Sequence, residues 1–362
     1  MKIRGAVFEA KDKPLTVEEL EMDETPGPGN VLVRYKASGI CGTDLHKSRN
    51  LDIPPHLLGH EGAGVVEAVG SGIDDLKVGD KVIMSFRSSC GNCFYCLRGQ
   101  NPQCEWGGGP ARTILRQKRY RRADGTMLDA DLGTFGEAAN VPRQYVVKVE
   151  SDLPFEQLAL VGCGVTTGFG AAVNTAGIRT GSTVAVIGCG GVGQSAIQGA
   201  RIAGASMIIA IDTVQSKLDY AIKNGATHTV LVADSVDTVA EVKALTAGRG
   251  ADFALEVTGF AENVVKGYEM VRRRGIVVAV GIKAAQVTLP IHEMILEEKR
   301  LYGSLYGSSQ VPVEFQRIID FAERGDIDLG AMVSNVIGLD EVNEGLDAMA
   351  EGKVIRSVIS YG

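Results

Sequence analysis

The sequence predicts an α/β protein with two parts, a mostly-β domain and a domain built on a doubly wound parallel sheet. Three observations carry this prediction. Short valine-rich runs bounded by glycine, proline and aspartate fill the first 150 residues. From Thr183 onward, strand-like runs alternate with helix-like segments of ten or more residues, which is typical of a parallel sheet. A chain of 362 residues also exceeds what one hydrophobic core usually organises.

The first part reads as strands without regular helical patterning. The runs VLVRYKAS, GAGVVEAVG and KVIMSF are rich in strand formers, and PGPGN and GSGIDDLKVGD supply turns between them. The last fifty residues predict helices around Val313–Arg324 and Glu341–Met349 and a final strand, VIRSVIS. We expect this end of the chain to return to the first domain.

The second part has the alternation of a doubly wound sheet. The strand-like runs TVAVIG, MIIAID, HTVLVA, DFALEV and IVVAVG follow at similar intervals, with helical segments between them. The run LYGSLYG is a candidate sixth strand. The predicted domains are therefore 1–164 together with 306–362, and 165–305.

Composition and charge narrow the class of protein. An apolar content of 45% with 22% charged residues describes an ordinary globular chain. The formal net charge of −7 argues against nucleic acid or an anionic membrane as a main partner. We find no apolar run long enough to span a bilayer, and the start MKIRGAVFEAKDKP lacks the apolar segment of a signal peptide. We therefore expect a soluble, cytoplasmic protein.

A glycine-rich turn follows the strand TVAVI and opens a helix. GCGGVG fits the pattern G-x-G-x-x-G with Gly188, Gly190 and Gly193, and Asp212 ends the next strand. In such a turn the glycines allow a tight bend, close approach of a pyrophosphate and close helix packing, while the helix N-terminus offers free N–H groups. Asp212 would accept hydrogen bonds from ribose hydroxyls and repel a 2′-phosphate. This pattern favours NAD over NADP. The alternative interpretation is a glycine turn needed only for packing.

Four of the seven cysteines lie in one short loop. Cys90, Cys93, Cys96 and Cys104 follow the spacing C-x-x-C-x-x-C-x7-C. Four thiolates can close a tetrahedron around Zn²⁺ with no open position, which predicts a structural site. An iron–sulfur cluster is the main alternative, but ferredoxin runs have a shorter final gap and a proline after the last cysteine. Disulfides are the third interpretation. They are disfavoured, because an odd cysteine count in an intracellular chain favours metal ligation.

Three further metal-capable residues are dispersed along the chain. They are Cys41 in CGTDLH, His60 in LGHEGAG and Cys163 in VGCGVT. No spacing argument joins them, and each alone is more often a core residue than a ligand.

The order and separation of these motifs resemble a known family. CGTDLH, GHEGAGVVEAVG, the four-cysteine loop, GCG and GCGGVG occur in the order found in the zinc-dependent alcohol dehydrogenases of the medium-chain dehydrogenase/reductase superfamily. The resemblance covers essentially the whole chain. It implies a GroES-like catalytic domain with zinc over 1–164 and 306–362, and an NAD-binding Rossmann domain over 165–305.

The resemblance also implies roles for individual residues. Cys41, His60 and Cys163 would bind a catalytic zinc and leave one position open, which matches a catalytic site with two cysteines and one histidine. Asp44 would orient His60, and Glu61 would lie near the metal and assist ligand exchange. Zinc would lower the pKa of an alcohol, which then passes hydride to NAD. The proton would leave through two residues of one stretch, Thr43 and His46.

Coenzyme and substrate contacts follow from the same resemblance with less weight. The coenzyme would be held by residues of the glycine-rich turn and by more distant positions: Gly188, Gly190, Gly191, Val192, Gly193, Asp212, Lys217, Thr167, Val280, Ile282 and Arg356. Four apolar residues would wall the substrate pocket, with plain core packing as the alternative for each: Phe86, Leu132, Ile282 and Leu305. This apolar set predicts a primary or secondary alcohol larger than ethanol.

Departures from the family pattern leave alternatives open. Gly42 replaces a basic residue that contacts the pyrophosphate in many members, so we expect coenzyme to leave faster. The stretch from about Glu105 to Asp131 resembles in length the insertion of dimeric members of the family, which implies a homodimer. A thiol-dependent formaldehyde dehydrogenase or nitrosothiol reductase is the second interpretation, although EWGGGP lacks the arginine of the glutathione-dependent members. A non-catalytic nucleotide sensor is the third, but such relatives lose zinc ligands.

One basic segment is not accounted for by any of these motifs. Six basic residues lie between positions 112 and 122: Arg112, Arg116, Lys118, Arg119, Arg121 and Arg122. A solvated loop or subunit contact is the first interpretation, and an anion site is the second.

Overall fold

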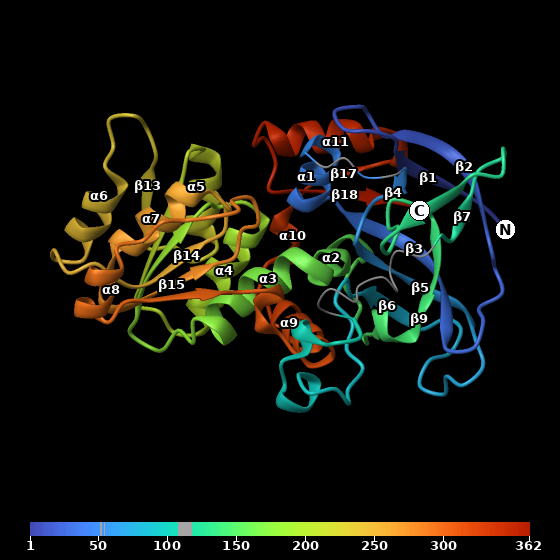
Figure 1. The fold of residues 1–362 in the computed structure, drawn as a ribbon, viewed down its shortest axis with the longest axis horizontal. Coiled ribbons are helices and arrows are strands. Elements are labelled where there is room, and N and C mark those ends of the chain that lie inside the picture. Colours follow the sequence, from blue (N-terminus) through green and yellow to red (C-terminus); the bar gives the residue numbers. More distant parts are fainter. Residues whose placement is uncertain (51–52, 54, 108–117) are drawn as a thin grey trace. The chain divides into compact units, whose positions relative to one another are not determined.

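The computed structural model describes residues 1–50, 53, 55–107 and 118–362 (Figure 1). The chain divides into two compact units. Unit 1 comprises Met1–Cys163, Gln310–Arg324 and Leu329–Gly362. Unit 2 comprises Gly164–Ser309 and Gly325–Asp328.

Unit 1 is mostly β, as the valine-rich runs predict. Five short strands close a barrel in the order β1-β2-β7-β8-β4, and a second sheet has the order β10-β6-β5-β3-β18-β17, with β9 paired to β3. The strands of unit 1 are β1 Lys2–Phe8, β2 Thr16–Met22, β3 Asn30–Gly39, β4 His56–Leu57, β5 Glu61–Val69, β6 Lys81–Met84, β7 Tyr120–Arg121, β8 Met127–Ala130, β9 Ala138–Pro142, β10 Val146–Lys148, β17 Val333–Ile337 and β18 Arg356–Ser360.

Unit 1 also holds helices, two of which match those expected around Val313–Arg324 and Glu341–Met349. Its helices are α1 Gly42–Asn50, α2 Phe155–Leu160, α9 Val311–Glu323, α10 Leu329–Met332 and α11 Val342–Ala350. The expectation of an unbroken β pattern in the first 150 residues was therefore wrong at α1, which contains most of CGTDLH. This helix has little apolar periodicity to reveal it, since only Asp44 and Ser48 among its nine residues are buried. The final strand β18 pairs with β3, with Val358 opposite Gly39.

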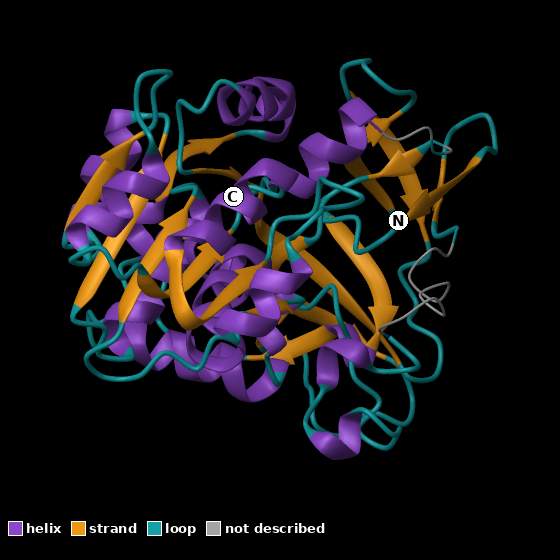
Figure 2. Ribbon diagram, turned by 60° about the vertical axis from the view of Figure 1, so that its left-hand side comes forward, coloured by secondary structure: helices purple, strands orange, loops and turns teal. Residues whose placement is uncertain are grey.

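Unit 2 is a six-stranded parallel sheet with helices on both faces (Figure 2). The strand order is β13-β12-β11-β14-β15-β16, and every adjacent pair is parallel. The strands are β11 Thr183–Ile187, β12 Met207–Asp212, β13 His228–Leu231, β14 Ala251–Glu256, β15 Val271–Ala279 and β16 Arg300–Gly303. The helices are α3 Thr166–Gly170, α4 Gly191–Ile202, α5 Gln215–Lys223, α6 Thr238–Leu245, α7 Ala261–Met270 and α8 Ile291–Glu297.

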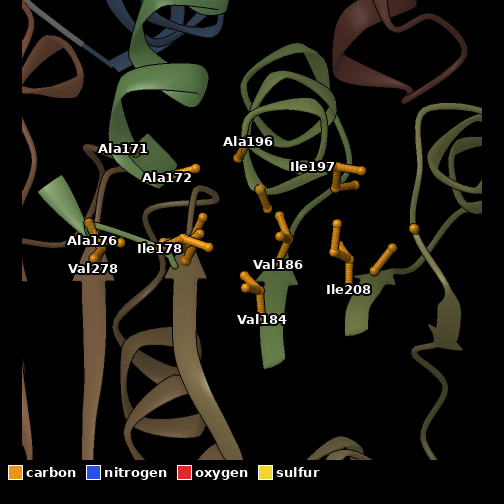
Figure 3. Close-up of a cluster of buried hydrophobic side chains, with 14 of the residues drawn as sticks. Ala171, Ala172, Ala176, Ile178, Val184, Val186, Ala196, Ile197, Ile208 and Val278 are labelled. Atoms are coloured by element: carbon orange, nitrogen blue, oxygen red, sulfur yellow. The ribbon is translucent and has the colours of Figure 1, made fainter. Parts of the chain in front are cut away.

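The alternation of side chains along the strands builds two cores in unit 2. Val184 and Val186 of β11 face one side, where they pack in a cluster with Ala196 and Ile197 of α4 (Figure 3). Ala185 and Ile187 belong to the cluster on the other side, with Val242 of α6 and Tyr268 of α7. Because successive strand residues point to opposite faces, a strand covered on both sides must be apolar throughout. This requirement explains the unbroken run TVAVI.

The segment Phe155–Thr175 corrects the expectation about membrane-spanning runs. It is 21 residues of continuous helical structure and apolar enough, by length and composition, to cross a bilayer. However, 78% of its most apolar window is buried inside the protein, as in a core helix. Two π-helical turns interrupt it, η5 Val161–Val165 and η6 Ala171–Thr175. Such turns widen a helix locally and are frequent at functional sites.

Candidate functional site

Unit 1 brings together the three dispersed residues that sequence spacing could not join. Cys41 lies just before α1, His60 just before β5, and Cys163 in the π-helical turn η5. Strands β3 and β5 are antiparallel with Gly39 opposite Glu61, so the end of one meets the start of the other. Metal-binding atoms of Cys41, His60, Glu61 and Cys163 lie within 4.8 Å of one another, and all four residues are buried.

The donor atoms of this cluster suit zinc. Two thiol sulfurs and one imidazole nitrogen form the set expected of a catalytic site that keeps one position open. Hydrogen bonding from the Cys163 thiol lowers the pKa of Cys41, and the neighbouring His60 acts in the same direction against the effect of burial. A depressed pKa favours the thiolate, which is the form that binds a metal.

Asp44 fixes the orientation of His60. Asp44 is fully buried, and its Oδ1 lies 3.1 Å from His60 Nδ1. Its Oδ2 accepts a hydrogen bond from the backbone N–H of Cys41 at 3.1 Å. Burial, the largest single effect, lowers the pKa of His60, but the Asp44 carboxylate and the Cys41 thiolate together outweigh it, so the pKa lies well above its usual value. With Nδ1 bonded to Asp44, Nε2 is the nitrogen left to bind a metal.

Glu61 is paired with Arg356, a contact that no sequence motif indicated. Both side chains are buried, and the guanidinium donates to Glu61 Oε2. Burial raises the pKa of Glu61 to about 7, while Arg356 acts in the opposite direction. Gly39 makes room for the carboxylate, because a Cβ at this position would collide with Glu61 Oε2. The pairing could not be read from sequence because the partners are 295 residues apart.

The two residues expected to carry a proton both lie on α1. Thr43 is exposed and His46 is half-buried. His46 Nδ1 lies 3.3 Å from the Asn50 amide nitrogen, one turn further along the helix. The helix therefore carries Asp44 on its buried side and the two proton-active side chains towards solvent.

The four cysteines of the loop also lie together, within 4.8 Å of one another by their sulfurs. Cys93 and Cys104 have their sulfurs 3.9 Å apart, and the Cys104 sulfur accepts the Cys90 N–H at 3.3 Å. Four thiolates at about 2.3 Å from one Zn²⁺ would have sulfurs roughly 3.8 Å apart, so the spacing fits zinc. Hydrogen bonds from the backbone N–H groups of Cys96 and Glu105 lower the pKa of Cys93 to about 6.

The glycine-rich turn of unit 2 has the conformation that its pattern predicts. Gly188 has φ +96°, which favours glycine, and α4 begins at Gly191. A Cβ at Gly193 would collide with the Gly188 carbonyl oxygen, so Gly193 permits close packing. Asp212 ends β12, and its carboxylate accepts hydrogen bonds from the N–H groups of Cys189 at 2.6 Å and Val214 at 2.9 Å. Asp212 therefore also fixes the turn.

A cavity of about 170 Å³ lies beside this turn within unit 2. Asp212 lines it from β12, and Thr258, Phe260 and Asn263 line it from the segment after β14. These last three residues were missed from sequence. Thr258 and Phe260 follow the carboxyl end of the strand next to β11, and Asn263 lies in the first turn of α7. Ligands bind at this end of open α/β sheets, so topology would have indicated these residues.

The other residues expected to contact coenzyme or substrate differ in how exposed they are. Val192, Thr167, Lys217 and Leu305 are half-buried. Phe86 stands edge-on to the ring of His60, with centroids 5.5 Å apart, and Ile282 is 76% exposed.

Two predicted contact residues belong to the hydrophobic core instead. Leu132 is fully buried in a core cluster of unit 1, and its carbonyl accepts the Tyr35 hydroxyl. A side chain with no exposed surface cannot wall a pocket, so that prediction is corrected. Val280 is 7% exposed and packs in the core of unit 2.

The basic segment is partly explained by pairing within the chain. Arg112 and Arg116 lie outside the described residues. Arg122 pairs with Glu9 and Glu18, and Arg121 lies 3.5 Å from Glu21. Arg119 donates to the carbonyls of Ala130, Asp131 and Asn140. Among the described residues of the segment, these arginines hold strands together, which favours a structural role over an anion site.

Comparison with known proteins connects both units to one class of enzyme. Residues 27–151 match the family "Alcohol dehydrogenase GroES-like domain", and residues 191–324 match "Zinc-binding dehydrogenase". The NDMA-dependent alcohol dehydrogenase of Amycolatopsis methanolica is 40% identical over 100% of this chain and 99% of its own. The S-(hydroxymethyl)glutathione dehydrogenase of Paracoccus denitrificans is 34% identical over the whole of both chains. The crystal structure of benzyl alcohol dehydrogenase from Acinetobacter calcoaceticus superposes with a TM-score of 0.91 at 30% identity, over 100% of both chains.

Proposed function

The chain belongs to the zinc-dependent alcohol dehydrogenases of the medium-chain dehydrogenase/reductase superfamily, and we propose that it oxidises a bulky apolar alcohol with NAD⁺. The alcohol is primary or secondary, and the product is an aldehyde or a ketone. The observation that carries the proposal is the buried cluster of Cys41, His60 and Cys163, which has the donor set of a catalytic zinc site.

Each residue of the cluster has a part in the proposed reaction. Cys41, His60 and Cys163 would hold zinc, and Asp44 keeps His60 in the orientation and tautomer that binding would require. Zinc supplies Lewis-acid activation of the alcohol oxygen when bound. Thr43 receives the proton of the alcohol, and His46 passes it to water from the exposed side of α1. A bound NAD would supply the hydride acceptor.

Unit 2 supplies the coenzyme site in this proposal. The glycine-rich turn, followed by α4, presents backbone N–H groups to a pyrophosphate. Asp212 lines the adjacent cavity and supports the preference for NAD, because a carboxylate repels a 2′-phosphate.

We propose that two copies associate through the free edge of the sheet in unit 2. Strand β16 ends the sheet order, so its outer backbone groups have no neighbouring strand among the described residues. Large apolar side chains of α8 and β16 are exposed beside it: Ile291, Ile295, Leu296 and Tyr302. An open strand edge with exposed apolar residues favours pairing with another chain.

A substrate panel tests the proposed reaction. Zinc-loaded protein is assayed with aromatic, allylic, long-chain secondary and short primary alcohols, each with NAD⁺ and with NADP⁺, by absorbance of the reduced coenzyme. We expect turnover with NAD⁺ and the bulkier alcohols. Turnover confined to ethanol or to NADP⁺ would contradict the proposal. A parallel series with NDMA as acceptor is suggested by the name of the 40% identical relative.

A second candidate reaction is oxidation of a thiol adduct of formaldehyde. It is supported by the full-length likeness to the S-(hydroxymethyl)glutathione dehydrogenase. The same assay with formaldehyde, with and without glutathione, separates the two reactions. Turnover that requires the thiol, with no reaction in the alcohol panel, would favour this second candidate.

A further inference from the structure

Glu256, the last residue of β14, is a buried carboxylate for which the proposed reaction has no use. It has no exposed surface. Its Oε1 accepts hydrogen bonds from the backbone N–H groups of Thr258 at 2.7 Å and Gly259 at 3.0 Å, and from the Thr258 hydroxyl. Its Oε2 accepts a second hydrogen bond from Gly259 at 3.1 Å. A buried carboxylate is costly unless it is hydrogen-bonded, and here those bonds all go to one turn.

The turn held by Glu256 forms one wall of the cavity beside the glycine-rich turn. Thr258 Oγ1 accepts hydrogen bonds from Asn263 Nδ2 at 2.9 Å and from the Phe260 N–H at 3.4 Å. All three residues line the cavity. The Thr258 methyl also packs against Gly188, where an added Cβ would lie 2.6 Å from it. The position of this wall therefore depends on the bonds that Glu256 accepts.

The same turn is locked to the loop that follows β15. Gly259 has φ +82°, and a Cβ there would lie 2.9 Å from the backbone of Gly281 and Ile282. A Cβ at Gly281 would in turn collide with Gly259, so the two glycines lie back to back. The Ala284 N–H donates to the Gly259 carbonyl at 2.8 Å.

The second loop carries an exposed apolar side chain. Ile282 is 76% exposed although it follows a buried strand. Lys283, its neighbour, stacks its ammonium 4.2 Å from the ring centroid of Phe260, which adds a further tie between the two loops. The hydrogen bonds of Glu256 therefore support both one wall of the cavity and the loop that carries Ile282.

We propose that Glu256 is a positioning residue for the coenzyme. Glu256 holds the cavity wall at Thr258 and the loop that carries Ile282 in one fixed arrangement. The proposal rests on the proposed coenzyme site. In it the adenosine half occupies the cavity that Asp212 lines, and Ile282, which the family resemblance implies as a coenzyme contact, serves the nicotinamide half. Glu256 touches neither half. Glu256 acts on the adenosine half by positioning Thr258. It acts on the nicotinamide half through the contact between Gly259 and Gly281, which positions the loop that carries Ile282.

Binding of AMP and of NADH to the full-length protein tests this proposal. In Glu256→Ala we expect NADH affinity to fall by about tenfold or more, and AMP affinity to fall by less, because AMP uses only one end of the arrangement. In Glu256→Gln the amide oxygen can take the place of Oε1 and keep the bonds from Thr258 and Gly259, so we expect NADH affinity within about threefold of the wild type.

Asp252 offers a matched control at the opposite end of the same strand. It accepts hydrogen bonds from the Thr183 N–H at 2.7 Å and from Arg272 at 2.6 Å. Asp252→Ala should lower the melting temperature and leave both affinities within about twofold, since distant sites act independently. Thr258→Val keeps the side-chain shape and removes one donor to Glu256, so it tests the same contact if Glu256→Ala does not fold. We expect its NADH affinity to fall about threefold.

Several outcomes would overturn the proposal. One is NADH affinity unchanged in Glu256→Ala, or in Thr258→Val where the former does not fold. Another is an equal loss of AMP and NADH affinity in Glu256→Ala, which would show that Glu256 affects only the cavity wall and not the loop that carries Ile282. A Glu256→Gln variant as weak as Glu256→Ala, or an equal loss in Asp252→Ala, would show charge or general stability to be the cause. Wild-type protein that binds no NADH would instead overturn the proposed function itself, and this inference with it.

Discussion

The two cysteine-containing clusters of unit 1 both offer metal-binding groups but are assembled in opposite ways. The loop cluster takes four cysteines from positions 90 to 104 of one short segment, and its residues are half-buried apart from Cys104. The second cluster takes Cys41, His60 and Cys163 from three separate elements, and all are buried. A local cluster stabilises the segment that contains it, whereas a dispersed cluster requires the fold to be complete before it exists.

The dispersed cluster is also the one with surrounding charged groups. Asp44 contacts His60, and Glu61 with Arg356 lies beside the sulfurs, all of them buried. No buried acidic or basic side chain is hydrogen-bonded to the four loop cysteines among the described residues. Groups that orient ligands and adjust charge are needed where chemistry occurs and are unnecessary around a closed structural ion.

Removing one ligand of the dispersed cluster should have the largest effect on activity. In Cys163→Ser we expect kcat to fall about a thousandfold, because a Lewis acid contributes several kcal/mol of transition-state stabilisation. The melting temperature should change little by comparison. Steady-state kinetics and a thermal melt on the same preparation check both statements. A variant that keeps kcat but melts early would assign this cluster to structure instead.

Removing the carboxylate behind His60 should have an intermediate effect. Asp44→Asn keeps the shape of the side chain but weakens the bond that orients His60, and such changes lower metal affinity or activity by about 10–100-fold. Zinc titration against a chelator measures the affinity. Asp347→Asn is the matched control, because Asp347 pairs with Arg49 of the same helix without contacting the cluster. An equal loss in the control would show that α1 had simply been destabilised.

Removing one ligand of the loop cluster should have the smallest effect on activity. Cys93→Ser opens the tetrahedron, and because structural zinc binding contributes to folding free energy we expect the melting temperature to fall by roughly 5–10 °C. The kcat of the protein that remains folded should stay within a few-fold of the wild type. Loss of activity at a temperature where the protein is still folded would contradict the division of roles between the two clusters.

Local sites could be predicted from the sequence alone, whereas sites assembled from distant segments could not. The four-cysteine loop and the turn from Gly188 to Gly193 are local, so spacing and flanking elements were enough to predict them. Cys41, His60 and Cys163 were connected only through family resemblance, since strand pairing between β3 and β5 brings the first two together. The pair Glu61–Arg356 and the turn beyond Glu256 depend on contacts between distant segments, which no short pattern records. Leu132 was misassigned because apolar character alone does not distinguish a pocket wall from the core.

We expect the two clusters to be separate zinc sites, of which only the dispersed one is catalytic. Zinc content per chain, measured by elemental analysis together with activity, tests this expectation most directly on the wild type, Cys163→Ser and Cys93→Ser. We expect the wild type to bind zinc at both clusters and each variant to lose the zinc of one cluster. Of the two variants, only Cys93→Ser should retain activity. A Cys163→Ser protein that retains the full zinc content and full activity would contradict this expectation.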